Sequence, residues 1–378
     1  MRVLGLSSGT SHDGVDAALV AFAPAADGES LRARVLHHAT TPYEPAVRDA
    51  IRAALPPGRV GLGDVCALDT MLGKAFADAA AEALRAAGPA DLICSHGQTL
   101  FHAAVDGTLQ LGQPAWIAER TGLPVVADVR ARDVAAGGEG APLVPVLDLM
   151  LVAGRPGRWG ALNIGGIANL TVAVPGEVRA YDTGPGNALL DAAALTLTGR
   201  PYDRGGALAA RGTVLPDLLD RLLAEPYYAR TPPKSTGKEL FCPDYLDGLL
   251  DGHAAADVLA TLTELTAATV AAEIRRHRLD TVVVSGGGVH NGTLRSRLAE
   301  LAAGAALVPS EDLGLPADAK EAVLFALIGW LTWHGLPASV PASTGAATAR
   351  VLGSIVPGSG PLRLPPPLRT PPRRLTVR

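Results

Sequence analysis

Residues 5–16 read GLSSGTSHDGVD, and this stretch decides between two classes of fold. Its first five residues match the G-x-S-x-G pattern in which hydrolases carry a nucleophilic serine. That arrangement needs a strand before the serine, a helix after it and an oxyanion loop from an earlier strand. Only six residues precede Ser7, and residues 15–20, VDAALV, predict a returning strand. The stretch is therefore interpreted as a strand-turn-strand hairpin.

A hairpin of this composition suits an anionic ligand. Glycine lets the backbone approach a ligand closely, and backbone N–H groups and hydroxyls donate hydrogen bonds to phosphate oxygens. Residues 9–14 supply two glycines and two hydroxyl side chains in one turn. The hairpin is a candidate phosphate site, with an ordinary polar turn as the alternative.

The composition favours a globular protein of two lobes. At 378 residues the chain exceeds the length at which one hydrophobic core usually stops growing. It has 37 acidic and 33 basic residues, a net charge of −4, so no global positive field favours nucleic acid as a partner. The three cysteines are far apart and form no C-x-x-C pair, which favours a reducing compartment over disulfides or zinc.

The chain shows no targeting or membrane signal. The N-terminal residues lack the pattern of a signal peptide. The longest apolar stretch, residues 322–335, is shorter than the roughly 20 residues that a membrane span needs, and predicts a buried helix. We expect a cytoplasmic protein without a membrane partner.

Strand and helix patterns alternate along the chain, as in α/β proteins. Strands are predicted at 2–6, 15–22, 124–128, 160–164, 168–174 and 281–285, and helices at 65–87, 186–198, 254–277, 292–303 and 320–334. From Val356 onward the sequence is rich in proline and poor in core residues, which predicts a flexible tail.

Three further glycine-rich turns follow predicted strands. They are NIGGIAN at 163–169, YDTGPGN at 181–187 and SGGGVHN at 285–291. The last lacks the G-x-G-x-x-G spacing and has no complete dinucleotide-binding half after it, which disfavours a Rossmann dehydrogenase. Residues 234–238, KSTGK, have the wrong spacing for a P-loop, and no strand leads into them. Each turn alone is equally compatible with a structural role.

The order of these features resembles the actin-like ATPase and sugar kinase superfamily, and within it the anhydro-N-acetylmuramic acid kinase family. The blocks that carry the resemblance, over about residues 5–345, are Ser8–Ser11 with Asp13–Gly14, Ser95–Thr99, Ala127–Asp128 with Arg130 and Arg132–Gly138, Asn163–Gly166, Asp182 with Gly184–Asn187, Pro233–Gly237 and Gly286–Gly288. Two positions depart from the family pattern: Ser7 replaces the more usual methionine, and His12 a common leucine.

The resemblance implies an α/β protein with the two-lobed actin-like ATPase fold, a duplicated ribonuclease H-like fold with a central ligand cleft. We expect a first lobe of residues 1–127 plus about 338–357, a second lobe of 128–337 and a tail of 358–378. The implied reaction is ATP-dependent conversion of 1,6-anhydro-N-acetylmuramic acid and water to N-acetylmuramic acid 6-phosphate, a step in recycling cell-wall sugar. The resemblance also implies Mg²⁺ as a cofactor and a homodimer.

The resemblance assigns Asp182 as the general base that activates the water. A helix cap or a ligand of a magnesium-bound water are the alternatives for this residue. ATP binding is assigned to Gly9, Thr10, Ser11, His12, Asp13, Gly14, Val15, Asp16, Gly165, Gly166, Gly286, Gly287 and Gly288. Asp13 is also the candidate ligand of hydrated Mg²⁺, which usually takes one or two carboxylates and keeps several waters.

Sugar contacts are expected from His96, Gln98, Arg130 and Glu321. The guanidinium fork of Arg130 matches the lactyl carboxylate of the sugar. An exposed position at the start of a helix explains Glu321 equally well. A kinase for another sugar on the same fold is the alternative enzyme, and a non-catalytic nucleotide or sugar sensor is the alternative from another class.

Overall fold

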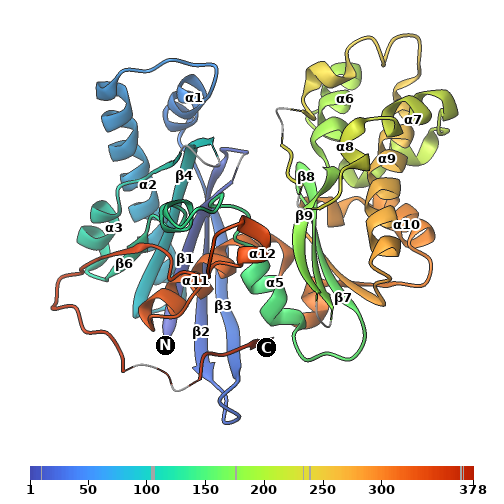
Figure 1. The fold of residues 1–378 in the computed structure, drawn as a ribbon. Helices are drawn as coiled ribbons and strands as arrows, with labels where there is room; N and C mark the ends of the chain where they lie inside the picture. The colour runs from blue at the N-terminus through green and yellow to red at the C-terminus, as the bar shows by residue number, and fades with distance from the viewer. Residues whose placement is uncertain are drawn as a thin grey trace. The chain divides into compact units, whose positions relative to one another are not determined.

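The computed structural model describes residues 1–9, 11–103, 107–174, 177–232, 234–237, 240–366, 368 and 370–378. The chain divides into two compact units, and both termini lie in the first (Figure 1). Unit 1 comprises Met1–Ala153, Leu313–Leu315 and Ala319–Arg378, and unit 2 comprises Gly154–Asp312 and Pro316–Asp318.

The sheet of unit 1 is built on a three-stranded meander. Strands β1, β2 and β3 pair antiparallel in sequence order, and β4 and then β6 continue the sheet parallel to β1. Strand β5 pairs with β4, β12 with β6, and β13 with β3 at the other edge. The bounds are β1 (Arg2–Ser8), β2 (Gly14–Pro24), β3 (Ser30–Pro42), β4 (Leu92–Ala103), β5 (Gly107–Leu111), β6 (Val125–Ala127), β12 (Ser354–Val356) and β13 (Arg374–Val377).

The sheet of unit 2 repeats this topology. Strands β7, β8 and β9 form an antiparallel meander, and β10 and then β11 continue it parallel to β7. The same strand order and directions occurring twice in one chain confirm the predicted duplicated ribonuclease H-like fold. The bounds are β7 (Trp159–Ile164), β8 (Ile167–Val174), β9 (Glu177–Pro185), β10 (Thr281–Ser285) and β11 (Ala306–Pro309).

Alternation along β1 determines which helices cover each face of the unit 1 sheet (Figure 1). Leu4 and Leu6 point into a core shared with α1, α2 and α3. On the opposite face, a Cβ added at Gly5 would overlap the Ala322 carbonyl, so α11 lies directly against the β1 backbone. The helices are α1 (Pro45–Ala54), α2 (Leu62–Ala87), α3 (Pro114–Thr121), α4 (Ala131–Ala135), α5 (Pro145–Val152), α11 (Lys320–Trp333) and α12 (Pro341–Thr344).

Helix α9 is the central helix of unit 2. One side packs with α10 against the sheet, and the other packs with α6 and α7 around Tyr227 and Phe241. It is the one described helix long and apolar enough to cross a membrane, and most of it is buried in this core. The helices are α6 (Ala188–Thr198), α7 (Pro216–Leu223), α8 (Pro226–Ala229), α9 (Ala255–Arg276) and α10 (Gly292–Leu301), with short 3-10 turns η1 (Arg204–Gly206), η2 (Ala209–Arg211), η3 (Pro243–Leu246), η4 (Gly287–His290), η5 (Ser310–Leu313) and η6 (Ala317–Ala319).

The division of the chain differs from the sequence prediction of lobes at 1–127 with 338–357 and at 128–337. Unit 1 continues to Ala153 because α4 and α5 belong to it. The chain returns to unit 1 at Ala319 because α11 packs on β1. The structure also differs from the predicted flexible tail at residues 358–378. Its last strand, β13, pairs parallel with β3, and Leu375 and Val377 are buried.

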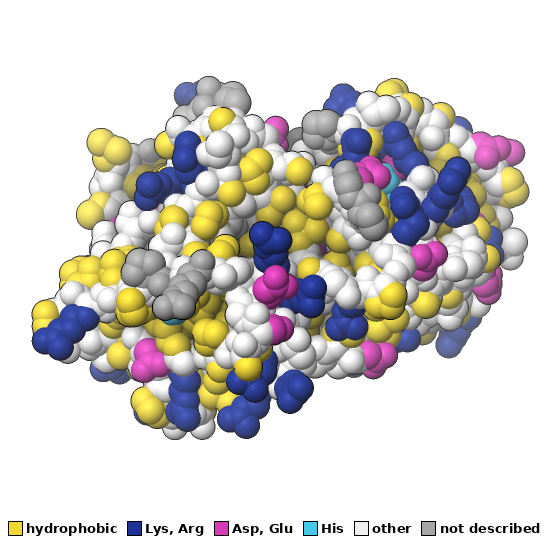
Figure 2. Space-filling view, turned by 60° about the horizontal axis from the view of Figure 1, so that its bottom comes forward, with side chains coloured by type: hydrophobic (Ala, Val, Ile, Leu, Met, Phe, Trp, Pro, Cys, Tyr) yellow, Lys and Arg dark blue, Asp and Glu magenta, His cyan; other side chains and the backbone are white. Residues whose placement is uncertain are grey.

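Charged side chains are interspersed on the surface. On the face that Figure 2 shows, Lys and Arg side chains lie among acidic, apolar and uncharged ones. This distribution agrees with the near balance of 33 basic and 37 acidic residues in the sequence.

Candidate functional site

The predicted phosphate hairpin joins β1 to β2. Ser7 lies inside β1 and is buried, so it is not at the strand-to-helix turn that a hydrolase nucleophile requires. A Cβ at Gly9 would face open space, with Ser11 Oγ as its nearest neighbour at 3.8 Å. At Gly14, by contrast, a Cβ would overlap the Thr41 carbonyl of β3. Gly9 therefore keeps the turn open to a ligand, whereas Gly14 lets two strands pack closely.

The side chains of the hairpin have different surroundings. Ser11 Oγ donates a hydrogen bond to Asp13 Oδ1 over 2.7 Å, and both residues are exposed. Val15 is buried in the core of unit 1, so only its backbone is available to a ligand. Asp16 Oδ1 accepts a hydrogen bond from the Thr40 hydroxyl of β3. The predicted ATP-binding residue Thr10 lies outside the described residues.

Gln98 lies beneath this hairpin and supports it. The side chain is buried, and its Oε1 accepts a hydrogen bond from Ser8 Oγ over 2.7 Å. Its Nε2 lies 3.2 Å from His12 Nδ1 and 3.3 Å from the Thr99 carbonyl. His12 has a positive φ of 55°. The Gln98 amide, predicted to bind sugar, thus has partners on the hairpin and on its own strand.

His96 and Arg130 form a second pair in unit 1. Arg130 Nε donates to His96 Nε2 over 2.8 Å, and Arg130 Nη1 donates to the Gly140 carbonyl over 2.8 Å. His96 Nδ1 lies 2.9 Å from the Gly97 carbonyl, and its ring stacks on Phe325 of α11. Because Nε2 accepts the bond from Arg130, Nδ1 carries the proton and the ring is neutral.

The electrostatics of this pair agree with the hydrogen bonds. Burial and then the nearby Arg130 charge hold the pKa of His96 well below its ordinary value. Burial also lowers the pKa of Arg130 to about 10, against the opposing effect of Glu321. Arg130 remains cationic at neutral pH, with Nε and Nη1 bound inside the unit. Its Nη2 group is the donor best suited to a carboxylate of a ligand.

Glu321 lies at the start of α11 and is the fourth predicted sugar contact. Its side chain is solvent exposed, yet protein surrounds it closely enough for desolvation to raise the pKa of its carboxyl. The charge of Asp16 raises that pKa further, whereas Arg130 and Lys320 lower it. The structure therefore brings Glu321 into the electrostatic environment of the hairpin and of Arg130.

The candidate general base, Asp182, lies near the end of β9 in unit 2. Its Oδ2 accepts hydrogen bonds from the Thr236 N–H over 3.0 Å and from Ser235 Oγ over 3.3 Å. Its backbone N–H donates to the Lys234 carbonyl, and its carbonyl accepts from Tyr227 Oη over 2.8 Å. The cap of α6 is Asn187, so Asp182 is not the helix cap that the sequence left as an alternative.

The two glycine turns of unit 2 meet beside this strand. Gly186 N–H donates to the Gly166 carbonyl over 2.9 Å, and Asn187 N–H donates to the Gly165 carbonyl over 2.8 Å. Gly286 has a φ of 85°, and a Cβ there would lie 2.7 Å from the Ile164 carbonyl. The turn 165–166 therefore contacts the residues that follow β9, and Gly286 packs against Ile164 at the end of β7.

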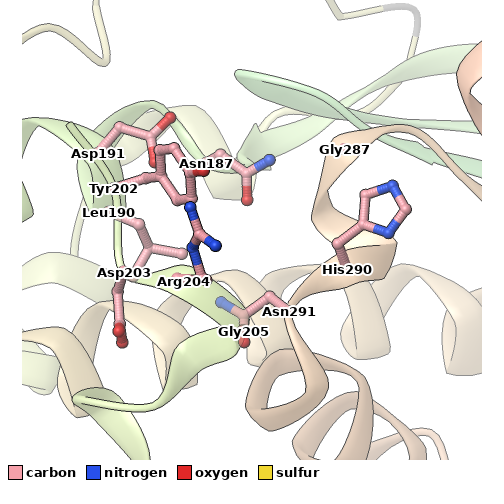
Figure 3. Close-up of a pocket in the computed structure, with 10 residues that line it drawn as sticks. All are labelled: Asn187, Leu190, Asp191, Tyr202, Asp203, Arg204, Gly205, Gly287, His290 and Asn291. Atoms are coloured by element: carbon pink, nitrogen blue, oxygen red, sulfur yellow. The ribbon is translucent and has the colours of Figure 1, made fainter.

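A pocket of about 580 Å³ opens next to these turns (Figure 3). Its walls come from α6, from the segment containing η1, and from η4 with the start of α10. Gly287 lines it, and a Cβ at Gly287 would have only Asn187 Nδ2 nearby, at 3.9 Å. The lining residues are Asn187, Leu190, Asp191, Tyr202, Asp203, Arg204, Gly205, Gly287, His290 and Asn291.

Gly287 is the one residue of this lining that was assigned to ATP from the sequence. Gly288 has a packing role, because a Cβ there would overlap the Ile164 side chain. The sequence gives little indication that the other lining residues belong to a site. Asn187 and Asn291 each end a glycine-rich turn, and Asn291 Oδ1 caps α10 by accepting from the Leu294 N–H over 3.0 Å. Tyr202 and Arg204 lie in no motif that marks a site.

Comparisons with known proteins identify the family of this chain. The family model for anhydro-N-acetylmuramic acid kinase matches residues 1–358. The anhydro-N-acetylmuramic acid kinase of Streptomyces coelicolor is 53% identical, over 100% of this chain and 99% of that protein. That of Rhodococcus erythropolis is 50% identical, over 95% of each chain. Component A of (R)-2-hydroxyglutaryl-CoA dehydratase from Acidaminococcus fermentans, a solved structure, aligns over 87% of this chain and 98% of its own at 14% identity and a TM-score of 0.46. Because the family model covers nearly the whole chain and both relatives align over at least 95% of their length, this chain belongs to the anhydro-N-acetylmuramic acid kinase family.

Proposed function

We propose that this protein uses ATP and water to convert 1,6-anhydro-N-acetylmuramic acid to N-acetylmuramic acid 6-phosphate in the cytoplasm, a step in recycling cell-wall sugar. The relatives that match over the full length carry the name of this kinase, which supports the reaction class. The observation that carries the mechanism is the carboxylate of Asp182, held by two donors from the 235–236 loop.

The proposed reaction couples two bond changes. Water attacks the anomeric carbon and gives its proton to the Asp182 carboxylate, and the bond from that carbon to O6 breaks. O6 then takes the γ-phosphoryl group, and ADP leaves. Loss of the water proton to a general base typically contributes about 10²- to 10⁴-fold to such a rate. The fixed position of the Asp182 carboxylate is consistent with this task.

The nucleotide assignment follows from the pocket in unit 2. A volume of about 580 Å³ lies within the roughly 300–1,000 Å³ range of small-molecule sites. We assign it to the adenosine side of ATP, because Gly287 leaves its floor as bare backbone and Arg204 and His290 supply polar walls. The hairpin of residues 9–16 and the turn 165–166 are assigned to the phosphates, where backbone N–H groups neutralise charge without a covalent step.

The donor set of the hairpin fits a hydrated magnesium ion. No cluster of three or more His, Cys, Asp or Glu side chains that could hold a metal occurs among the described residues. Mg²⁺ in kinases usually needs only one or two carboxylates besides waters and phosphates, and the exposed Asp13 carboxylate meets that need. When bound, the ion neutralises the charge of the phosphates. Asp13 itself is held in place by Ser11 Oγ.

The sugar assignment rests on Arg130, His96 and Glu321. The neutral His96 ring fixes the guanidinium of Arg130, and the Arg130 charge is suited to the lactyl carboxylate. Ordering the donor in advance reduces the entropy lost on binding.

Product analysis tests the proposed function. Purified protein is incubated with ATP, Mg²⁺ and a panel of anhydro and ordinary amino sugars in ¹⁸O-labelled water, and early products are identified by mass spectrometry. We expect a 6-phosphate only from the anhydro sugar, with the label in the sugar and not in the phosphate. Phosphorylation of an ordinary sugar instead would establish a different sugar kinase, and binding of both ligands without turnover would establish a sensor.

A further inference from the structure

A buried ion pair lies in unit 2, next to the strand that carries the candidate base. Lys234 Nζ is 3.2 Å from Glu273 Oε1, and the side chains of both residues are nearly inaccessible to solvent. Such residues are almost never fully buried unless they are paired. Lys234 belongs to the KSTGK stretch, which the sequence excluded as a P-loop. The structure shows its ammonium directed into the core and bound to α9.

The surroundings of this pair hold both charges in one place. Lys234 Nζ also lies 3.4 Å from the Tyr228 carbonyl, and it lies over the ring of Tyr227 at 5.1 Å from its centroid. On the other side, Glu273 Oε2 accepts a hydrogen bond from Tyr181 Oη over 2.9 Å. Both carboxylate oxygens of Glu273 therefore have partners, as a buried charge requires.

Residues next to the Lys234–Glu273 pair also contact or adjoin Asp182. Tyr181 is its neighbour in β9, and Tyr227, under the Lys234 ammonium, donates to the Asp182 carbonyl over 2.8 Å. The residues directly after Lys234 donate to the Asp182 carboxylate, through Thr236 N–H and Ser235 Oγ. The loop that holds the carboxylate is thus tied to α9 through the first of its residues.

We propose that Lys234, paired with Glu273, is a positioning residue for the general base: it anchors the 234–236 loop to α9 so that the loop donors orient the Asp182 carboxylate. This inference rests on the proposed function, since it concerns the base of that reaction. It assigns no contact with ATP or sugar to Lys234. Turnover depends on Lys234 only through its effect on Asp182, and ATP binding does not depend on Lys234.

The test uses a variant that removes both charges together. Lys234→Met alone leaves the buried Glu273 with only the longer 3.5 Å contact to the half-exposed Arg276 side chain, which is destabilising. In Lys234→Met/Glu273→Gln, both side chains stay similar in volume, and the glutamine still accepts the bond from Tyr181. Replacing a whole buried pair with hydrophobic groups of similar volume is often neutral for stability. We therefore expect the double variant to fold while lacking the ionic anchor.

A control removes a second ion pair from the same helix, in which Arg297 is partly exposed and also binds Glu300. Arg297 of α10 binds Glu264 of α9 through two nitrogens, and neither residue lines the nucleotide pocket or contacts the Asp182 loop. Glu264→Gln/Arg297→Met therefore reports the general effect of losing an α9 ion pair. Both double variants are compared with the full wild-type chain.

Three readouts separate positioning from a purely structural role. In Lys234→Met/Glu273→Gln we expect kcat to fall at least tenfold while KM for ATP stays within twofold. The acid limb of the kcat profile moves to higher pH, because the ionised carboxylate loses ordered donors. Hydrogen exchange of the peptide that contains Thr236 becomes faster. In the Glu264→Gln/Arg297→Met control, all three readouts stay at wild-type values.

Unchanged kcat, pH profile and exchange in a folded Lys234→Met/Glu273→Gln protein would overturn the inference. Equal losses in both double variants would also overturn it, because they would reflect general destabilisation. A wild-type protein that makes no sugar phosphate refutes the proposed function instead. The exchange measurement then still reports whether Lys234 anchors the loop.

Discussion

Replacing Asp182 with asparagine removes one function from the site and keeps its geometry. The amide oxygen of asparagine still accepts hydrogen bonds from Thr236 N–H and Ser235 Oγ, the two donors that hold Oδ2 in the wild type. The backbone contacts with Lys234 and Tyr227 do not involve the side chain. The amide cannot accept the proton of the attacking water. The substitution therefore isolates proton acceptance from positioning.

The expected loss of rate follows from that single function. Removing a general base typically costs about 10²- to 10⁴-fold in rate. At 1.36 kcal/mol for each factor of ten, this corresponds to about 3–5 kcal/mol of transition-state stabilisation. The pocket that we assign to adenosine does not include residue 182, so the affinity for ATP stays near the wild-type value. The melting temperature should change little, since the hydrogen bonds to the loop remain.

The assay follows ADP release with the anhydro sugar over a series of Mg²⁺ concentrations, together with calorimetric titration of ATP. A rate within threefold of wild type would refute the general-base assignment. Recovery of most of the activity at high Mg²⁺ would show that Asp182 acts on the metal. A parallel loss of ATP affinity would mean that the carboxylate shapes the nucleotide site.

Three other outcomes are expected. Gly287→Val should raise KM for ATP at least tenfold and leave the fold intact in circular dichroism, because Gly287 lines the pocket and a Cβ there has only Asn187 Nδ2 nearby, at 3.9 Å; an unchanged KM would remove ATP from this pocket. The lowered pKa of His96 keeps its ring neutral in the folded protein, whereas the unfolded chain takes up a proton below about pH 6.5, so stability falls as pH drops through that value. The melting temperature of His96→Gln should therefore fall less than that of wild type between pH 7.5 and 5.5. An equal fall would contradict the assignment of a neutral, buried His96 ring. Leu375→Ala should lower the free energy of unfolding by about 2–4 kcal/mol in urea titrations, since Leu375 of β13 is buried; no change would mean that β13 is not part of the folded unit.

The sequence predicted best those elements whose local pattern matches their final environment. The apolar stretch at 320–334 predicted a buried helix, and α11 spans Lys320–Trp333 with nearly every residue buried. The hairpin was recognised because glycine and hydroxyl residues separate two apolar runs, and β1 and β2 end and begin where those runs do.

Strand β4 was missed because polar residues of the site interrupt its apolar pattern. It begins with three apolar residues, but Ser95, His96 and Gln98 follow and are all buried. The burial of His96 and Gln98 is possible because Ser8, His12 and Arg130, which come from distant parts of the chain, bind these side chains. A single window of sequence does not contain that information.

The donors to Asp182 were unpredictable for the same reason. Ser235 and Thr236 follow Asp182 by 53 and 54 residues. The resemblance named the aspartate and the loop separately, but only the fold brings them together. The domain boundaries were misplaced because α11, which follows unit 2 in the chain, returns to pack on β1 through Gly5.

The contact between Gly5 and α11 also bears on the order of events during synthesis. Strand β1 is made first, but the helix that covers one of its faces leaves the ribosome more than 300 residues later. Unit 2, whose chain is almost continuous from Gly154 to Asp312, is complete before that helix is translated. Domains generally fold as units as they emerge. In the nascent protein we therefore expect the second unit to fold before α11 covers its face of β1.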